Sequence, residues 1–388
     1  MKWCLTIKSN KGDAMNRELL RKAKRIVVKV GTSTITYPNG KMNYDKIERL
    51  ARELTDLTNQ GKEVILVSSG AGAAGRARLG LTEKPKTIPG KQAAAAVGQG
   101  IIMHIYERIF GEYGQVVAQI LLTKIDAIDR HRYANSRNTF QALLDQKVIP
   151  IVNENDVVAL DELKIGDNDN MSALVAGIVD ADVDIILSDV AGLYTANPQT
   201  DKNAKLVPEV LEVTPALEAT AGGAGSAGGT GGMYTKLQAA KAAVSTGIHL
   251  VIASGDEPHV VSRILQGEEV GTLFVSRENR LQFRKRWLAF GARILGTITV
   301  DAGLAKAIKK KGSCSILPVG MTKVEGTFES GSTVSVVDET GHELARGLAN
   351  YDSEDLGKLI GVKTVDIEKV IGHKHFDEVI HRDNLVVL

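Results

Sequence analysis

The chain has 388 residues, of which 43% are hydrophobic and 24% are charged, so it can bury a sizeable core, and its length favours two domains or one large domain with an appendage. Its formal net charge of +2 is too small for the whole molecule to act as a polyanion binder. The two cysteines, Cys4 and Cys314, form no disulfide or zinc pattern and fit a reducing compartment. No apolar run is long enough to cross a bilayer, and the N-terminal residues lack the apolar core of a signal peptide. These features predict a soluble protein of the cytoplasm.

Residues 1–24 form a polar extension that runs into a short basic segment, for which we expect a helix. From Arg25 onward, apolar runs alternate with segments of helical spacing. Strands are predicted at 25–31, 64–70, 116–122, 148–153, 184–189 and 249–255, and helices at 45–60, 93–110, 132–145, 171–179 and 236–245. This alternation predicts an α/β fold in which a mainly parallel sheet is covered by helices on both faces.

The sequence pattern changes after about Phe274. The following residues are basic and irregular, and beyond them short alternating runs are separated by glycine turns, which favours a small β-rich module. We therefore expect four parts, namely an N-terminal extension at 1–24, an α/β domain at 25–275, a linker at 276–294 and a β-rich domain at 295–388.

Two clusters of carboxylates and amides follow the predicted strand at 148–153. The first spans 153–156 and the second spans 166–170, with Lys164 between them. So many polar groups beyond a strand end are costly to bury unless something binds there. Two well-capped loops are the alternative interpretation. Because both clusters flank one lysine, we favour a binding site for a charged, hydrogen-bonding ligand.

Turns at the ends of the predicted strands are candidate anion sites. Lys29 lies in an otherwise apolar strand, so its ammonium must reach water at the strand end or meet an anion. Residues 70–75 match GxGxxG, but no strand with a terminal acid follows at the spacing that a dinucleotide site needs. The glycine-rich segment 221–236 leads into a helix that bears a lysine, which suits a triphosphate, although a flexible linker is the alternative. Residues 188–194 form an ordinary acid-and-glycine turn.

Taken in order, these segments resemble the amino acid kinase family. The matching segments are VVKVGTS (27–33), VSSGAGAAGR (67–76), VGQG (97–100), LLTKIDAIDRHRYANSRNT (121–139), PIVNENDVVA (150–159), IGDNDNMSA (165–173), SDVAGLYTANP (188–198) and GTGGMYTKLQAA (229–240). The resemblance implies a three-layer sandwich with a mainly parallel central sheet at 25–275. The tail from about Thr297 to His373 resembles a PUA module, so we expect a PUA-like domain at 295–388.

The resemblance implies a kinase with a carboxylate acceptor. In the branch of the family that matches best, ATP gives its γ-phosphoryl group to the side-chain carboxylate of L-glutamate, which yields glutamyl 5-phosphate in the first step of proline biosynthesis. Mg²⁺ would bridge the β- and γ-phosphates, largely through phosphate oxygens and waters. No general base is needed, because the attacking oxygen is already ionised.

The resemblance also implies roles for individual residues. Lys29 and Lys236 would stabilise the transferring phosphoryl group, and Asp169 would orient them. The glutamate pocket would contain Ser69, Asp156 and Asn168, with Asp167 nearby. The ATP side would contain Lys29, Ser188, Asp189, Thr230, Gly231, Gly232, Met233, Tyr234, Thr235 and Lys236. No protein side chain is expected to hold a metal. Gly72 departs from the family, which often has Ile there.

Several alternatives stay open. The acceptor could instead be acetylglutamate, aspartate, carbamate or UMP. PUA-like modules occur in RNA-modifying enzymes, so RNA binding through the tail is a second hypothesis. A redox enzyme is another alternative, and it would be distinguished from a kinase by measurable binding of NAD(P)H. The resemblance further implies a homo-oligomer, dimer or tetramer, that proline inhibits. His373 and His375 are interpreted as a surface pair rather than as metal ligands.

Overall fold

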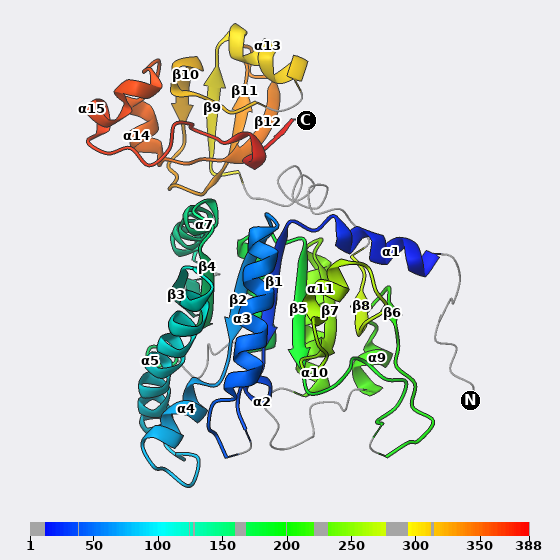
Figure 1. Ribbon diagram of the computed structural model, residues 1–388. Helices are drawn as coiled ribbons and strands as arrows, with labels where there is room; N and C mark the ends of the chain where they lie inside the picture. Colours follow the sequence, from blue (N-terminus) through cyan, green and yellow to red (C-terminus); the bar gives the residue numbers. More distant parts are fainter. Residues whose placement is uncertain are drawn as a thin grey trace. The chain divides into compact units, whose positions relative to one another are not determined.

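The computed structural model divides the chain into two compact units (Figure 1). The larger unit spans Met1–Ile128 and Asn135–Arg280, and the smaller unit spans Asp129–Ala134 and Leu281–Leu388. Each unit has its own sheet and its own apolar core. The structure describes residues 12–37, 39–123, 125–126, 129–159, 168–198, 200–220, 232–276, 294–311 and 314–387.

Within the described residues, the larger unit is built on an eight-stranded sheet in the order β3-β4-β2-β1-β5-β7-β8-β6. The strands are β1 (Arg25–Val30), β2 (Glu63–Ser68), β3 (Val117–Leu122), β4 (Ile149–Glu154), β5 (Val183–Ser188), β6 (Glu209–Val210), β7 (His249–Ser254) and β8 (Thr272–Phe274). Strands β7 and β8 pair antiparallel, and the other neighbouring pairs are parallel. The predicted mainly parallel sheet is confirmed.

The strand order reverses next to β1. After β1 the chain adds β2, β3 and β4 on one side, and it then returns past β1 to place β5 on the other side. In open α/β sheets, ligands bind beyond the carboxyl ends of the strands at such a reversal. The topology therefore marks the ends of β1 and β5 as the place to look for a site.

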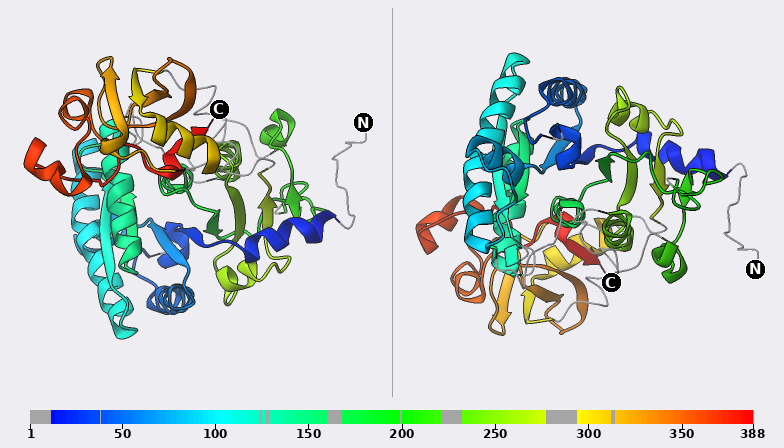
Figure 2. Two further views of the ribbon diagram at one scale, coloured as in Figure 1. Left: turned by 90° about the horizontal axis from the view of Figure 1, so that it is seen from above. Right: turned by 90° about the horizontal axis from the view of Figure 1, so that it is seen from below.

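Helices cover both faces of this sheet. Helices α3, α5 and α11 pack on one face and α8 and α10 on the other, as the views along the strands in Figure 2 show. The helices that accompany the sheet are α1 (Gly12–Arg21), α2 (Thr32–Ile35), α3 (Tyr44–Asn59), α4 (Ala71–Arg78), α5 (Ile88–Glu112), α7 (Arg130–Asp145), α8 (Asn168–Ile178), α9 (Pro215–Thr220), α10 (Met233–Ser245) and α11 (Val260–Leu265). No helix of the described segments is long and apolar enough to span a membrane.

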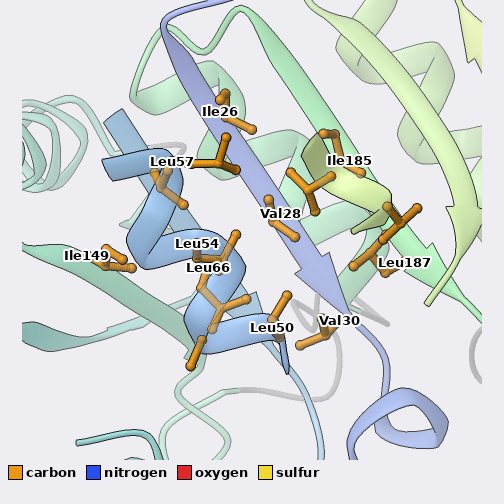
Figure 3. Close-up of a cluster of buried hydrophobic side chains, with 14 of the residues drawn as sticks. Ile26, Val28, Val30, Leu50, Leu54, Leu57, Leu66, Ile149, Ile185 and Leu187 are labelled. Carbon is orange, nitrogen blue, oxygen red and sulfur yellow. The ribbon is translucent and has the colours of Figure 1, made fainter. Parts of the chain in front are cut away.

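Side chains of β1 alternate between the two faces of the sheet. Val28 and Val30 are fully buried in the core beneath α3, where Leu54 lies over them (Figure 3). Lys29 stands between these two valines in the sequence, so it points to the opposite face, on which α8 packs against β1. The alternation of side chains along β1 thus directs Lys29 toward α8.

Helices α4 and α5 approach closely because glycines lie where they cross. A Cβ atom on Gly75 would lie 1.7 Å from the carbonyl oxygen of Ala94, and one on Gly98 would lie 1.7 Å from the carbonyl oxygen of Ala71. Gly75 is the last glycine of the GxGxxG match. Close helix packing therefore explains why glycine is required at this position.

Helix α1 is an integral part of the larger unit. Its Leu20 lies in the main core. The guanidinium of Arg17 is buried and donates hydrogen bonds of 2.7 to 3.1 Å to four backbone carbonyls, those of Pro208, Glu268, Val270 and Gly271. The basic helix expected in the N-terminal extension is therefore present, and it is packed against the fold.

The smaller unit is a β-rich module with short helices. Within its described residues, five strands pair in the order β10-β9-β11-β12-β13, with β9 and β11 parallel and the other pairs antiparallel. The strands are β9 (Gly296–Val300), β10 (Met321–Glu325), β11 (Thr333–Val337), β12 (Glu343–Leu348) and β13 (Leu385–Val387), and the α-helices are α13 (Ala302–Lys311), α14 (Ser353–Lys358) and α15 (Ile367–Ile371). The predicted β-rich module is confirmed.

Candidate active site

Lys29 is buried at the centre of the sheet. Strand β1 lies between β2 and β5, and the lysine is only 6% exposed. A buried ammonium needs an anionic partner, and Asp169 provides it, because Lys29 Nζ lies 2.5 Å from Asp169 Oδ1. Of the two options that the sequence left for this lysine, water and an anion, the structure selects the anion.

Asp169 joins three segments of the chain. It lies in the first turn of α8 and is fully buried. Its Oδ2 atom lies 3.2 Å from Lys236 Nζ and accepts a hydrogen bond of 3.0 Å from Thr235 Oγ1. Gly232 is the N-cap of α10, so the first turn of this helix carries both Thr235 and Lys236 to Asp169. Lys29 and Lys236, which are remote in sequence, thus bind opposite oxygens of one carboxylate.

This cluster of Lys29, Asp169 and Lys236 holds two ammonium groups and one carboxylate. Burial acts to raise the pKa of Asp169, but the charges and hydrogen bonds of Lys29 and Lys236 outweigh it and hold the pKa below its ordinary value. Asp169 is therefore ionised at neutral pH. The excess positive charge, in a place of low solvent access, favours a polyanion such as a chain of phosphates.

Asn168 connects the start of α8 to the ends of β2 and β4. Its Nδ2 atom lies 2.7 Å from Ser69 Oγ, 3.1 Å from the carbonyl oxygen of Ser68 and 3.1 Å from Asn153 Oδ1. Asn153 in turn donates a hydrogen bond of 2.9 Å to Gln99 Oε1. The structure thus brings together Ser69 and Asn168, both of which the resemblance assigned to the glutamate pocket.

Sequence reasoning gave no role to Asn153 or Gln99. Asn153 ends an otherwise apolar strand and belongs to the first polar cluster, which was a usable signal. Gln99 lies inside a helix, and nothing in its local sequence marks it. Asp184 was also passed over, although a carboxylate inside an apolar strand is unusual. It is fully buried on β5, and its Oδ2 atom lies 2.9 Å from Ser172 Oγ of α8.

Apart from Lys29 on β1, the described residues assigned to the nucleotide lie at the end of β5 and at the start of α10. Ser188 ends β5, and its hydroxyl donates a hydrogen bond of 2.9 Å to Asp189 Oδ1. Met233 and Tyr234 occupy the first turn of α10. The predicted residues Thr230, Gly231 and Asp167 lie outside the described residues. Asp156 lies in the turn after β4 and is partly exposed.

Two predicted helices begin three residues earlier than expected. Helix α8 starts at Asn168 rather than at 171, and α10 starts at Met233 rather than at 236. Residues 168–170 and 233–235, which precede the predicted helix starts, form the first helical turns. Asn168, Asp169, Thr235 and Lys236 consequently project from helix N-termini, whose exposed backbone amides attract anions.

A cavity of about 330 Å³ lies between α3 and the turn after β7, and Val30 and Leu187 line it at the ends of β1 and β5. Charged side chains that line it pair with one another, Lys46 with Asp256 and Arg49 with Asp45. Neither Asp169 nor the two lysines that bind it line this cavity. The chemistry of the site is therefore assigned from the buried charges and not from the cavity.

Comparison with known proteins identifies the family of the chain. Residues 24–254 match the amino acid kinase family, and residues 296–371 match the PUA domain. The first match covers more than half of the chain, so the chain belongs to the amino acid kinase family. The second match confirms the PUA-like tail that the sequence predicted.

Individual relatives indicate which members of the family the chain resembles in sequence. The chain is 55% identical to "Glutamate 5-kinase" of Moorella thermoacetica, over 96% of this chain and 98% of that protein. It is 53% identical to "Glutamate 5-kinase" of Caldanaerobacter subterraneus subsp. tengcongensis, over 94% and 98%. It is 48% identical to "Glutamate 5-kinase" of Geobacter sp. strain M21, over 96% and 100%. Within its family, the chain groups with the glutamate 5-kinases.

Proposed function

We propose that the chain transfers the γ-phosphoryl group of ATP to the side-chain carboxylate of L-glutamate, which is the first step of proline biosynthesis. In this reaction a carboxylate oxygen of glutamate forms a bond to the γ-phosphorus, while the bond from that phosphorus to the β,γ-bridging oxygen breaks. ADP leaves with the electron pair of the broken bond. The observation that carries the proposal is the meeting of Lys29 and Lys236 on Asp169.

Charge neutralisation is the main task of such a site. The attacking carboxylate and the ATP phosphates are both anionic, so they repel each other unless cations lie between them. Lys29 reaches the site from the end of β1 and Lys236 from α10, on the two sides of Asp169. Asp169 fixes both ammonium groups before substrate arrives, so they need little reorganisation when charge develops on the transferring group.

The glutamate pocket is proposed on the β2 and β4 side of this cluster. Ser69 and Asn168 would hold the amino acid by hydrogen bonds, and Asp156 with Asp167 would pair with its ammonium group. Support comes from the contacts of Asn168 with Ser69 and Asn153, which fix its side chain at the strand ends.

The nucleotide is proposed on the β5 and α10 side. Ser188 and Asp189 would lie near it, together with the segment from Thr230 to Lys236. Mg²⁺ enters as a complex with ATP and is part of that substrate. It would offset charge on the β- and γ-phosphates and keep several of its waters. Within the described part of the chain, no group of three or more His, Cys, Asp or Glu side chains is placed to hold a metal of its own.

The acceptor is tested by ADP release from ATP with L-glutamate, N-acetylglutamate, aspartate, carbamate and UMP in parallel. We expect turnover with L-glutamate and a kcat/KM for each other acceptor that is lower by at least about 10²-fold, because the site must pair the ammonium group and reach the side-chain carboxylate. A clear preference for any other acceptor would contradict the proposal. NAD(P)H should show no binding in the same preparation.

RNA binding is a second candidate function, supported by the PUA match at 296–371. Filter binding of a structured RNA at two salt concentrations tests it, because phosphate contacts weaken as salt rises. Retention that is weak and independent of salt would remove this function.

The family resemblance supports three further proposals about the whole protein. We expect a homo-oligomer, dimer or tetramer, that works in the cytoplasm and is inhibited by proline. Proline shares an α-carboxylate and an ammonium group with glutamate, so inhibition should be relieved by added glutamate. Sedimentation velocity tests the oligomeric state, and steady-state kinetics with proline and L-glutamate tests the inhibition.

A further inference from the structure

Strand β5 carries a carboxylate inside the central sheet. Asp184 pairs in register with Val27 of β1 and Leu250 of β7, so it has strands on both sides. The residue has no solvent exposure, and in the described part of the chain its Oδ1 atom has no hydrogen-bond partner. An ionised carboxylate in such a place is costly, because it has given up its water without a cation in contact.

Ser172 connects this carboxyl group to the bridging aspartate. Ser172 Oγ lies 2.9 Å from Asp184 Oδ2 and 2.9 Å from the backbone carbonyl oxygen of Asp169, and Ser172 is itself fully buried. A hydroxyl has one proton, so it cannot donate fully to two acceptors. If Asp184 carries a proton, its OH donates to Ser172 Oγ and the Ser172 hydroxyl donates to Asp169. Both short contacts are then satisfied.

The surroundings of Asp184 as a whole favour its protonated form, as the count of hydrogen-bond protons does. Burial raises the pKa of Asp184 to about 8, and the negative charge of Asp169 acts in the same direction. The hydrogen bond from Ser172 and the positive charge of Lys29 on β1 act in the opposite direction and are weaker. Lys236 of α10 is bound to Asp169. At neutral pH the carboxyl group is therefore mainly neutral.

We propose that Asp184 is a positioning residue for phosphoryl transfer, which as a neutral acid holds Ser172 and, through it, the backbone of the Asp169 that bridges Lys29 and Lys236. It touches no substrate. This inference rests on the proposed function, since the reaction it serves is the transfer to glutamate. Loss of its proton places a second negative charge beside Asp169, which attracts Lys29 and lowers the net positive charge that the site presents to the incoming phosphates.

A plain packing role is the alternative, and the pH dependence of turnover separates the two. A packing residue affects stability alone, whereas a neutral positioning acid gives the wild-type protein an alkaline loss of kcat that a non-ionising replacement lacks. Asp184→Asn has the same shape and cannot ionise. Asp182→Asn removes a charge two residues before Asp184, at the residue that precedes β5. Asp182 accepts hydrogen bonds there from the backbone of Lys24 and Arg25, and the variant serves as the matched control.

The experiment measures kcat and KM for ATP and L-glutamate from about pH 6.5 to about pH 9.5, which is about 1.5 pH units on either side of the Asp184 pKa. Circular dichroism is recorded at each pH. Asp184→Asn should retain kcat at pH 7 within about threefold and show a smaller alkaline fall than the wild type. Asp184→Leu should lower kcat about tenfold with little change in either KM, because misplaced lysines act on the transition state. Ser172→Ala should lower kcat similarly, and adding Asp184→Leu to it should cost little more.

Coincident pH profiles of the wild type, Asp184→Asn and Asp182→Asn would overturn the inference, even if Asp184→Leu fails to fold. An Asp184→Leu protein that folds and turns over as the wild type does would also overturn it. Failure of the proposed function is distinguishable, because it appears as a wild-type protein without ADP release on glutamate. In that event, the pH dependence of the unfolding free energy still shows whether Asp184 is protonated in the folded protein. An equal dependence in the wild type and in Asp184→Asn would reject the inference.

Discussion

Lys29 and Lys236 are buried cations that the fold tolerates because one carboxylate binds both. Removing either lysine leaves Asp169 with a single cationic partner and removes a charge that is proposed to act on the transferring group. The consequence should appear in the rate of transfer more than in substrate binding, because the charge on the phosphoryl oxygens is rearranged most in the transition state.

We therefore expect Lys29→Ala and Lys236→Ala each to lower kcat by about 10²- to 10³-fold, with smaller changes in KM. Steady-state kinetics with ATP and L-glutamate measures this. Lys241→Ala is the matched control, because Lys241 lies on the same helix as Lys236, is half exposed and pairs with Glu218. A Lys29→Ala protein that keeps its kcat would contradict the assignment.

The amide of Asn168 should act on glutamate rather than on ATP. Its contacts with Ser69 and Asn153 orient it at the ends of β2 and β4. Asn168→Ala should raise KM for L-glutamate by about tenfold or more, the effect of losing one or two hydrogen bonds to a charged ligand. KM for ATP is the internal control, and an equal rise in both constants would argue against a separate glutamate pocket.

The buried acid of β5 should make stability depend on pH. The pKa of Asp184 is about 8 in the folded protein against an ordinary value of 3.8, so the folded state keeps a proton that the unfolded state releases above about pH 4. The free energy of unfolding attributable to this group therefore falls as pH rises from about 4 to 8, by at most about 1.4 kcal/mol per pH unit. Urea denaturation at about pH 5.5 and about pH 8, which lie inside this range and at its upper end, should show a larger loss of unfolding free energy in the wild type than in Asp184→Asn. Equal losses would show that Asp184 is ionised in the folded protein.

The sequence predicted some of these residues and could not predict others. Lys29 was identifiable because a lysine inside an apolar strand requires an unusual environment, and Asn168 and Asp169 because they belong to a dense polar cluster. Asn153, Gln99, Ser172 and Asp184 depend on contacts between segments that are distant in the chain. Local polarity indicates that such a residue is special, but it does not specify its partner.

At the scale of elements, strands were predicted better than helix starts. Apolar runs of β-branched residues end abruptly at polar or glycine residues, so β1, β4 and β5 were placed within one or two residues. The starts of α8 and α10 were missed because Asn, Asp and Gly are typical of turns as well as of first helical turns. Both starts carry site residues, so the error coincided with the functional region.

The crossing of α4 and α5 gives a prediction at this scale. Gly98→Ala should destabilise the protein by about 1–3 kcal/mol, because the new methyl group would overlap the carbonyl oxygen of Ala71 and force the helices apart. Gly100 lies on the same helix with open space around its Cα, so Gly100→Ala should stabilise by up to about 1 kcal/mol. Thermal unfolding of both variants measures the difference, and equal effects would contradict the packing argument.

At the scale of the molecule, each of the two units buries a core of its own. Lys29, Asp169 and Lys236, with the residues that hold them, all belong to the larger unit. A change of composition at about residue 275 was enough to suggest two domains. The arrangement of strands within each sheet was not readable in this way, because it depends on pairings between distant segments.

We expect a fragment of residues 1–276 to keep phosphoryl transfer, with kcat within about tenfold of the full chain. The basis is that no residue of the proposed chemistry lies beyond Lys236. Activity and circular dichroism of the fragment, beside the full-length protein, test this. A folded fragment without turnover would show that the PUA domain takes part in the reaction.

The reversal of strand order beside β1 has a consequence for how the two substrates meet. Strands β2 and β4 end at the residues proposed for the amino acid, and β5 ends at those proposed for the nucleotide, with β1 between them. Adjacent strands lie about 4.8 Å apart, so the proposed sites would hold donor and acceptor roughly two strand widths from each other across the tip of β1. The transferred group would therefore travel sideways over a single strand, from one half of the sheet to the other, and Lys29 stands where that passage occurs.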